Sequence, residues 1–215
     1  MARIEETASD RTAPFPAVEA LLLLFRLEAA KGASPRQQML FERVRDFALS
    51  GTEAPLNPLV KAKAMLTLAD AALKAGDLSE ATSWIDKALA LVPQRDPSAA
   101  ASVIRGVGEA LSGVARLQQR RPAQALESMQ MAQQELSKVL GPGHPLTHLF
   151  SLNMALGLDA LGRRPEAMVR VLQAEPILRR ALGESSPTFV RVQRLKARLR
   201  GDTGIGTFDA SDFFS

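Results

Sequence analysis

The feature that constrains this 215-residue chain most is a turn-like sequence that occurs twice in similar form. The stretch "LGPGHPLT" begins at Leu140, and "LGESSPTF" begins 42 residues later at Leu182. Both have glycine in the second place and proline in the sixth, between runs whose apolar residues recur at three- and four-residue steps. Glycine is favoured just beyond a helix end, and proline in the first turn of the next helix. The repeated turn therefore predicts repeated helical units.

Proline marks helix starts along the whole chain. It follows Ser34, Asn57, Asp96, His144 and Ser186, and all of these except His144 are residue types that cap helix N-termini well. Glycines close several of the runs between these marks. These prolines and glycines predict about nine helices, at roughly 16–31, 35–50, 57–75, 79–93, 97–119, 122–140, 145–161, 165–182 and 187–200. Since no run alternates at period two, the predicted fold class is all-α.

Small residues recur at a fixed offset inside the predicted hairpins. A step of 12 residues joins Ala69 to Ala81, Gly113 to Ala125 and Ala155 to Ala167, and Ala88, Ala132 and Ala174 follow in the three hairpins. The hairpins advance by 44 and then 42 residues. Small side chains let two helices approach closely within a hairpin and let the next hairpin stack on it. The pattern predicts a stack of antiparallel helical hairpins.

The first of these hairpins resembles a tetratricopeptide repeat. Leu68-Ala69 stands at the family's Leu-Gly, Gly76-Asp77-Leu78 at its turn, Ala81, Ile85 and Ala88 on its second helix, and Pro93 at its end. The 42-residue step with "LGPGHP" at the junction is similar to the longer kinesin-light-chain variant, which is also common in bacterial repeat proteins. The resemblance covers about residues 57–200, and it implies a right-handed α-solenoid.

The later repeats depart from the family at two positions of the first helix, where the family usually has Trp and Tyr. The residues found there are Met65 and Ala72, then Glu109 and Arg116, then Ser151 and Leu158. These departures leave other helical-hairpin solenoids open. We expect flexible ends at 1–15 and 201–215, a capping hairpin at 16–56, and three repeats plus a capping helix over 57–200.

Composition excludes several kinds of chemistry. The chain has no cysteine, which excludes disulfides, thiolate zinc sites and cysteine nucleophiles. Its most apolar run, "VEALLLLFRLEAA", is broken by Arg26 and Glu28 and is too short to span a bilayer. The N-terminus lacks the apolar region of a signal peptide, so we expect a cytoplasmic location. The net charge of +4 does not by itself indicate nucleic acid.

No arrangement of polar side chains predicts catalysis. His144 and His148 have the spacing of a metal-binding pair, but no third ligand is evident nearby, and we interpret His144 as part of the turn. The stretch "GDTGIG" at 201–206 lacks the strand before and the helix after that a phosphate-binding loop requires. Paired carboxylates for acid–base work are also missing. We expect a protein without enzymatic activity, cofactor or metal.

In tetratricopeptide arrays, the first helices of successive hairpins line a concave groove. The resemblance places thirteen residues of this chain there, namely Lys63, Leu66, Asp70, Leu73, Lys74, Val107, Val114, Leu117, Gln118, Leu149, Leu152, Asn153 and Leu156. Of the Lys and Asn residues with which the family clamps a C-terminal carboxylate, only Asn153 matches. The mapped surface is largely aliphatic, which suits an apolar peptide or an amphipathic helix. The alternative is that several of these residues are core.

Two C-terminal features carry further hypotheses. The aromatic residues Phe208, Phe213 and Phe214 in "TFDASDFFS" make this tail a candidate to dock in the groove of its own chain, or of a second copy in a homodimer. The alternative is a disordered terminus. The last helix carries Arg191, Arg194, Lys196, Arg198 and Arg200. We interpret it as the solvated face of a capping helix and not as a nucleic-acid site, because no recognition-helix pattern accompanies the charge.

These features predict a class of function without naming a partner. We expect a cytoplasmic, bacterial adaptor or scaffold without a membrane segment, which binds a peptide or an amphipathic helix of another protein through a few buried anchors. Two alternatives stay open. One is a secretion-type chaperone that holds an aggregation-prone client, and the other is a regulatory module whose curvature changes when a small molecule or peptide binds.

Overall fold

The computed structural model describes residues 15–29, 34–50 and 57–202, and in these ranges it contains nine α-helices and no strand. The helices are α2 (Phe15–Ala29), α3 (Pro35–Leu49), α4 (Pro58–Ala75), α5 (Leu78–Ala90), α6 (Ala99–Gln118), α7 (Pro122–Leu140), α8 (Pro145–Ala160), α9 (Arg164–Leu182) and α10 (Pro187–Arg200). Each end lies within three residues of its predicted place. The prediction of an all-α solenoid of about nine helices is confirmed.

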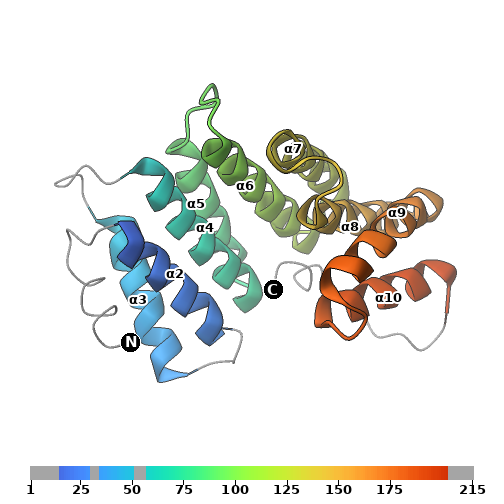
Figure 1. Cartoon of the computed structure of the whole chain (residues 1–215), viewed down its shortest axis with the longest axis horizontal. Helices are drawn as coiled ribbons and strands as arrows, with labels where there is room; N and C mark the ends of the chain where they lie inside the picture. Colours follow the sequence, from blue (N-terminus) through green and yellow to red (C-terminus); the bar gives the residue numbers. More distant parts are fainter. Residues whose placement is uncertain (1–14, 30–33, 51–56, 203–215) are drawn as a thin grey trace.

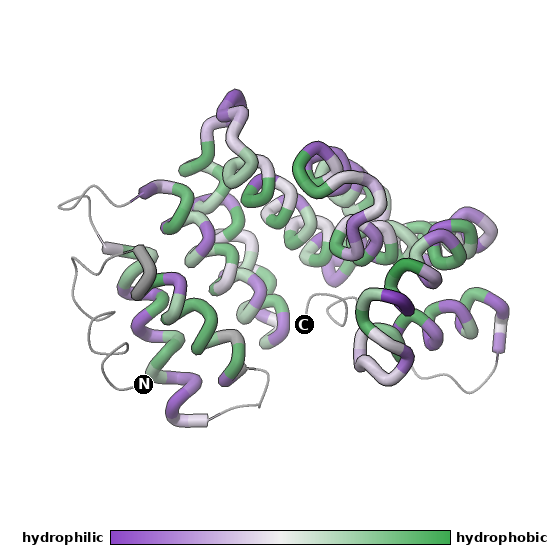
Figure 2. Tube along the Cα trace, viewed as in Figure 1, coloured by the Kyte–Doolittle hydropathy of each residue, from purple (hydrophilic) through white to green (hydrophobic). Residues whose placement is uncertain are grey.

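The helices stack as successive hairpins along a curved path (Figure 1). The pairs are α2–α3, α4–α5, α6–α7 and α8–α9, and α10 follows alone within the described ranges. Each of α4, α6, α8 and α10 also packs against the second helix of the preceding hairpin. A large apolar cluster runs from Val18 in α2 to Leu199 in α10, and a second, smaller cluster is formed by Ala110, Ala132, Leu136 and Phe150 of α6, α7 and α8. Figure 2 shows hydrophobic and hydrophilic residues interleaved along every helix, as expected where one side of a helix faces a neighbour.

No described helix is both long and apolar enough to cross a membrane.

The two copies of the repeated turn, at Gly141 and Gly183, have the same backbone conformation at the glycine. Gly141 lies at φ 81°, ψ 160°, and Gly183 lies at φ 80°, ψ 157°. These dihedral angles fall in a region that is essentially restricted to glycine. The N–H of each glycine donates to the carbonyl oxygen four residues before it, at 3.0 Å in both turns. The prediction that these stretches are equivalent turns between hairpins is confirmed.

Side-chain caps begin the helices that follow these two turns. Ser186 Oγ accepts a hydrogen bond from the N–H of Phe189 at 3.1 Å. His144 Nδ1 accepts one from the N–H of Leu146 at 3.2 Å, so an imidazole here takes the place of the usual hydroxyl or carboxylate. The structural role predicted for His144 in the turn is confirmed.

One predicted capping residue is wrong. The sequence predicts a start at Asp96-Pro97, but α6 begins at Ala99, and Ser98 Oγ caps it by accepting from the N–H of Ala101 at 3.2 Å. Asp96 Oδ1 instead accepts from the N–H of Ser98 at 2.9 Å, which lowers the pKa of Asp96. A good capping residue before a proline can therefore close a turn just ahead of the helix.

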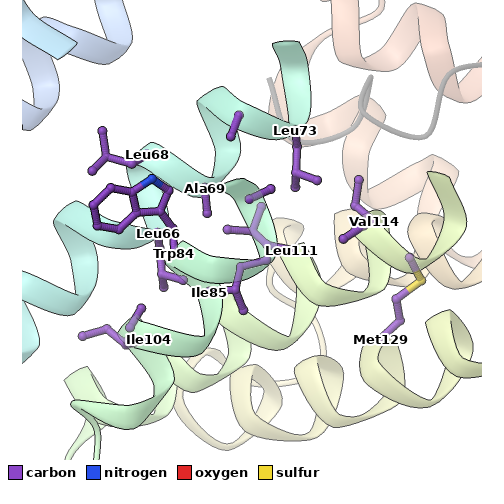
Figure 3. Packing of buried hydrophobic residues seen from close by; sticks show 14 of the residues in the cluster. Leu66, Leu68, Ala69, Leu73, Trp84, Ile85, Ile104, Leu111, Val114 and Met129 are labelled. Atoms are coloured by element: carbon purple, nitrogen blue, oxygen red, sulfur yellow. The ribbon is translucent and has the colours of Figure 1, made fainter. Parts of the chain in front are cut away.

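The small residues of the repeat lie where paired helices cross. All eight alanines of the pattern have 0% exposure, and Gly113 is buried. A Cβ added to Gly113 would lie 2.7 Å from Met129 Cγ and 3.2 Å from the carbonyl oxygen of Ala125, so α6 and α7 approach closely there. Figure 3 shows Ala69 among side chains from α4, α5 and α6. Small size at these positions is what lets each hairpin close.

Polar side chains replace aromatic packing in the second repeat. Ser128 in α7 is fully buried, and its Oγ donates to Glu109 Oε2 at 2.9 Å and accepts from Arg116 Nη1. Arg116 also donates to the carbonyl oxygen of Gln124 at 3.3 Å. Glu109 and Arg116 stand where the tetratricopeptide pattern has bulky aromatic residues, and here they join α6 to α7 by hydrogen bonds.

The close approach of α6 and α7 makes a prediction about two glycines. Gly113→Ala should lower the free energy of unfolding by about 1–3 kcal/mol, because the new methyl group overlaps packed atoms of α7. Gly157→Ala in α8 is the matched control, since its nearest neighbours lie 3.9 Å from the added Cβ. That control should gain about 0.5–1 kcal/mol from helix propensity. Denaturant unfolding followed by circular dichroism measures both changes, and changes of the same sign would contradict the packing.

The first turn of α8 makes a prediction about pH. Burial lowers the pKa of His148, although a hydrogen bond with the backbone of Pro142 opposes the effect, and the Nε2 of His148 is buried without a partner. The unfolded chain takes up a proton on this residue near pH 6.5, while the folded protein resists it. The unfolded state therefore binds more protons, and stability should fall as pH drops below about 6.5.

Two variants separate this effect from the titration of other groups. His148→Phe should remove the part of the stability loss between about pH 7 and 5.5, before carboxylates titrate near pH 4. His144→Asn changes the chain's other histidine while keeping a capping residue, so it should retain the loss. Thermal unfolding in a pH series measures both. An unchanged pH profile in His148→Phe would contradict the assignment.

Candidate functional site

The thirteen predicted groove residues lie on three successive first helices of hairpins. We call this set the first-helix surface: Lys63, Leu66, Asp70, Leu73 and Lys74 on α4, Val107, Val114, Leu117 and Gln118 on α6, and Leu149, Leu152, Asn153 and Leu156 on α8. Helix α4 packs directly against α6, and α6 meets α8 over a smaller contact. Residues up to 55 positions apart in the chain, Lys63 and Gln118, thus belong to neighbouring helices.

Six residues of the first-helix surface are buried. They are Leu66, Leu73, Val114, Leu152, Asn153 and Leu156, with exposed fractions from 0 to 8%. The five apolar members belong to the continuous core. The sequence left open whether the first-helix surface is a groove or part of the core. In the structure these six side chains are buried.

The other seven residues reach the surface to different extents. Val107, Leu117 and Leu149 are half-buried and pack against the edge of the core. Lys63, Asp70 and Gln118 are half-buried, and Lys74 is exposed. The accessible part of the first-helix surface therefore combines three aliphatic and four polar side chains.

The charged members of this surface already have partners. Lys63 Nζ binds Glu19 Oε2 on α2, and Lys74 Nζ binds Asp70 Oδ2 within α4 at 3.0 Å. Because opposite charges neutralise each other at this end of the stack, the α4 part of the surface attracts neither sign strongly. Its contribution to binding a partner would come from shape and apolar contact.

Helix α8 is enclosed more completely than a surface helix of a solenoid. Nine consecutive residues, Phe150–Leu158, are buried. It packs mainly against α7 and α9, meets α6 more lightly, and is joined to α10 by the ion pair of Asp159 and Arg198. A helix that is buried on all sides needs a neighbour on each side.

Asn153 is a polar exception among these buried residues. Its exposed fraction is 1%, and its Oδ1 atom has no hydrogen-bond partner. Leaving a buried acceptor unpaired costs about 1–3 kcal/mol, so native proteins contain few such groups. Asn153 is also the one residue that matches the family's clamp positions. The structure therefore presents an unused acceptor beside the aliphatic residues of α8.

At the C-terminal end, charged pairs tie the last helix to its neighbours. Asp159 on α8 has a carboxylate that is 4% exposed, and it binds Arg198 Nε at 2.9 Å and Arg164 Nε at 3.3 Å. Glu175 on α9 accepts from Lys196 and, at 3.0 Å, from Gln193 Nε2, and the Lys196 bond is the main cause of the lowered pKa of Glu175.

These pairs correct part of the interpretation of the last helix as a solvated face. Lys196 and Arg198 bind carboxylates of α9 and α8, whereas Arg194 and Arg200 are exposed. Sequence reasoning missed the pair of Asp159 and Arg198, since their partnership depends on how α10 lies against α8. In the described ranges, no three His, Asp or Glu side chains gather as a metal site would need. The candidate docking residues Phe208, Phe213 and Phe214 lie outside the described residues.

Comparison with solved structures finds this architecture elsewhere. The crystal structure of nearly identical TPR-like repeats, from a protein described as a kinesin light chain of Podosopora anserina, matches with a TM-score of 0.60 and 19% sequence identity. The match covers 92% of this chain and 91% of that chain. No family model matches the sequence, and the search of curated proteins finds no match. The chain therefore has the fold of tetratricopeptide-like helical repeats.

Proposed function

We propose that this protein is a non-enzymatic interaction module whose first-helix surface binds an apolar peptide or an amphipathic helix of another protein. The observation that carries the proposal is the buried, unpaired Oδ1 of Asn153 among aliphatic side chains. Binding sites commonly combine an apolar lining with a few polar groups that orient the ligand. A carboxamide oxygen without an internal partner is such a group.

The chemistry of Asn153 suits the main chain of a peptide. A peptide offers one N–H donor at nearly every residue, and Asn153 Oδ1 can accept one of them. Apolar side chains of the ligand would then pack beside Val107, Leu117 and Leu149, the half-buried aliphatic residues of the surface. Affinity would come from these anchors, and orientation from the hydrogen bond.

We further propose that the chain's own residues 203–215 occupy this surface until a partner displaces them. The burial of Leu73, Asn153 and Leu156, three members of the first-helix surface, supports this. The 13 residues start after the two residues that follow α10, and fully extended they would span about 43–47 Å. Stacked helices lie about 10 Å apart, so this length would pass α8 and α6.

The aromatic residues of the segment fit this role. Phe208, Phe213 and Phe214 would supply the apolar anchors that the aliphatic residues of α6 and α8 can bury. A partner with similar anchors would have to compete with a tethered peptide, whose effective concentration reaches the millimolar range. Only a partner whose affinity or concentration is high enough to displace the tethered segment would therefore bind.

A peptide-binding experiment tests this proposal. A fluorescein-labelled peptide of residues 203–215 should bind a chain that lacks those residues and bind the full chain at least about tenfold more weakly, because the tethered copy competes. Fluorescence anisotropy measures both affinities. A peptide with serine at the three phenylalanine positions serves as the negative control. Equal binding to both proteins, or none to the truncated one, would rule the proposal out.

Matched variants locate the binding surface in the truncated chain. Leu149→Asp places a carboxylate on the first-helix surface and should weaken peptide binding. Leu172→Asp makes the same change at a side chain of α9 that is already 49% exposed, and should leave binding unchanged. Light scattering distinguishes a tail that docks in its own chain from one that docks in a second copy. Docking in a second copy would double the mass measured for the full chain but not that of the truncated chain.

Asn153→Leu separates a binding role of the carboxamide from a structural one. Leucine has the same branching as asparagine without its polar atoms, so the fold should gain about 1 kcal/mol when the unpaired acceptor is removed. In the truncated chain the same change should weaken peptide binding several-fold, because the main-chain hydrogen bond is lost. Unfolding and anisotropy measurements give the two effects, and unchanged affinity would assign Asn153 a structural role only.

A further inference from the structure

Helix α2 forms one end of the described stack, and α10 forms the other (Figure 1). Within the described ranges, α2 packs against α3 and, more lightly, against α4. The later first helices α4, α6 and α8 each pack in addition against the second helix of the hairpin before them. Because α2 is the first described helix, no preceding hairpin supplies this neighbour there, and one side of α2 lies open.

The open side of α2 is made of leucines. Ala20, Leu23 and Leu27 follow one another at three- and four-residue steps, so they share one side of the helix. Leu23 is 58% exposed and Leu27 is 52% exposed, whereas Leu21 and Phe25 are buried in the core. Among the α2 side chains that the structure describes, these two leucines are the exposed ones. We call Leu23 and Leu27 the leucine face. A helix with apolar residues all round is expected to be covered on every side.

The other end of the stack has a different chemistry. The exposed residues of α10 are Pro187, Val190, Arg194 and Arg200, so cations interrupt its apolar side. An apolar helix laid against α10 would desolvate guanidinium groups without giving them a partner, which is costly. The terminal units of a repeat array need a polar outer side. Helix α10 meets this requirement and α2 does not, and the two ends do not complement each other.

The acidic residues beside the leucine face are neutralised within the chain. Glu19 pairs with Lys63 of α4, and Glu28 Oε1 lies 3.8 Å from Arg36 Nε of α3. The leucine face therefore offers little charge that a partner of opposite sign could complement. Because like charges are not brought together, it also does not repel a copy of itself.

We propose that the leucine face of α2 is a dimer interface, covered by the leucine face of a second copy of this chain. A twofold axis between Leu23 and Leu27 would set the two α2 helices antiparallel, with Leu23 of each copy against Leu27 of the other. Since only one end of the stack is apolar, association closes at two molecules, whereas complementary ends would give an open filament. The contact uses neither the first-helix surface nor residues 203–215.

The concentration dependence of the mass tests this interface. Two exposed leucines per copy make a small contact, so the dimer should be weak and form as the protein is concentrated. Light scattering should show the mass rising toward two copies and not beyond, in the full chain and in the chain without residues 203–215 alike. A single copy at every concentration, or a mass that keeps growing, would overturn the proposal. So would a rise confined to the full chain, which would indicate exchange of the tail.

A pair of matched variants locates the contact. Leu23→Glu combined with Leu27→Glu should abolish the rise in mass, because four carboxylates would meet across the axis. Both side chains are exposed, so circular dichroism should show an unchanged fold. The control is Val169→Glu combined with Leu172→Glu, at two side chains of α9 that are 53% and 49% exposed. The control should keep the dimer, since α9 carries four arginines and two glutamates and two copies would repel there. The same mass for both variants would contradict the assignment to α2.

Cross-linking tests the antiparallel arrangement independently of these variants. The chain has no cysteine, so an introduced thiol reports only its own contact. A mixture of the Leu23→Cys and Leu27→Cys proteins should form a disulfide-linked dimer on mild oxidation several-fold faster than either protein alone, because a disulfide requires the two Cβ atoms to lie close together. A mixture of the Val169→Cys and Leu172→Cys proteins is the control and should link slowly. Equal rates in the two mixtures would overturn the α2 interface.

Discussion

Close approach of paired helices at small side chains is the constraint on which the rest of this structure depends. Every alanine of the repeated pattern is fully buried, and at Gly113 a methyl group would meet both Met129 and a backbone oxygen of α7. Because the same contact recurs in each hairpin, the hairpins have similar shapes and can stack with a shared core. The order of the first helices, and hence the first-helix surface, follows from that stacking.

Polar contacts then orient the hairpins where apolar packing would allow several arrangements. Arg105 donates to the carbonyl oxygens of Pro93 and Asp96 and to Glu135 of α7, so it fixes the loop before α6 to the following helix. Glu109 and Arg116 share the buried hydroxyl of Ser128. Such contacts are directional, and a buried polar group without its partner is costly, which favours one register.

The last helix ends the stack by breaking the rule that builds it. Arg194 lies seven residues before the positive-φ Gly201, whereas a small residue, Ala155, lies seven before the positive-φ Gly162 of α8. Asp159 and Glu175 hold α10 through its basic side chains. A terminal unit of a repeat array needs a polar outer side, and the basic side chains of α10 supply one.

The sequence by itself determined the helices, the repeated turn and the hairpin crossings, because proline, glycine, capping residues and alanine act over a few residues of chain. It assigned the cap of α6 to Asp96, where Asp96 and Ser98 are both capping residue types and Ser98 is the one that caps. Only the tertiary structure decided that Leu152 and Leu156 are enclosed while Leu149 reaches the surface, that Asn153 has no partner, and that Asp159 meets Arg198. These properties depend on how separate hairpins lie against one another, and the local spacing of residues carries no measure of that.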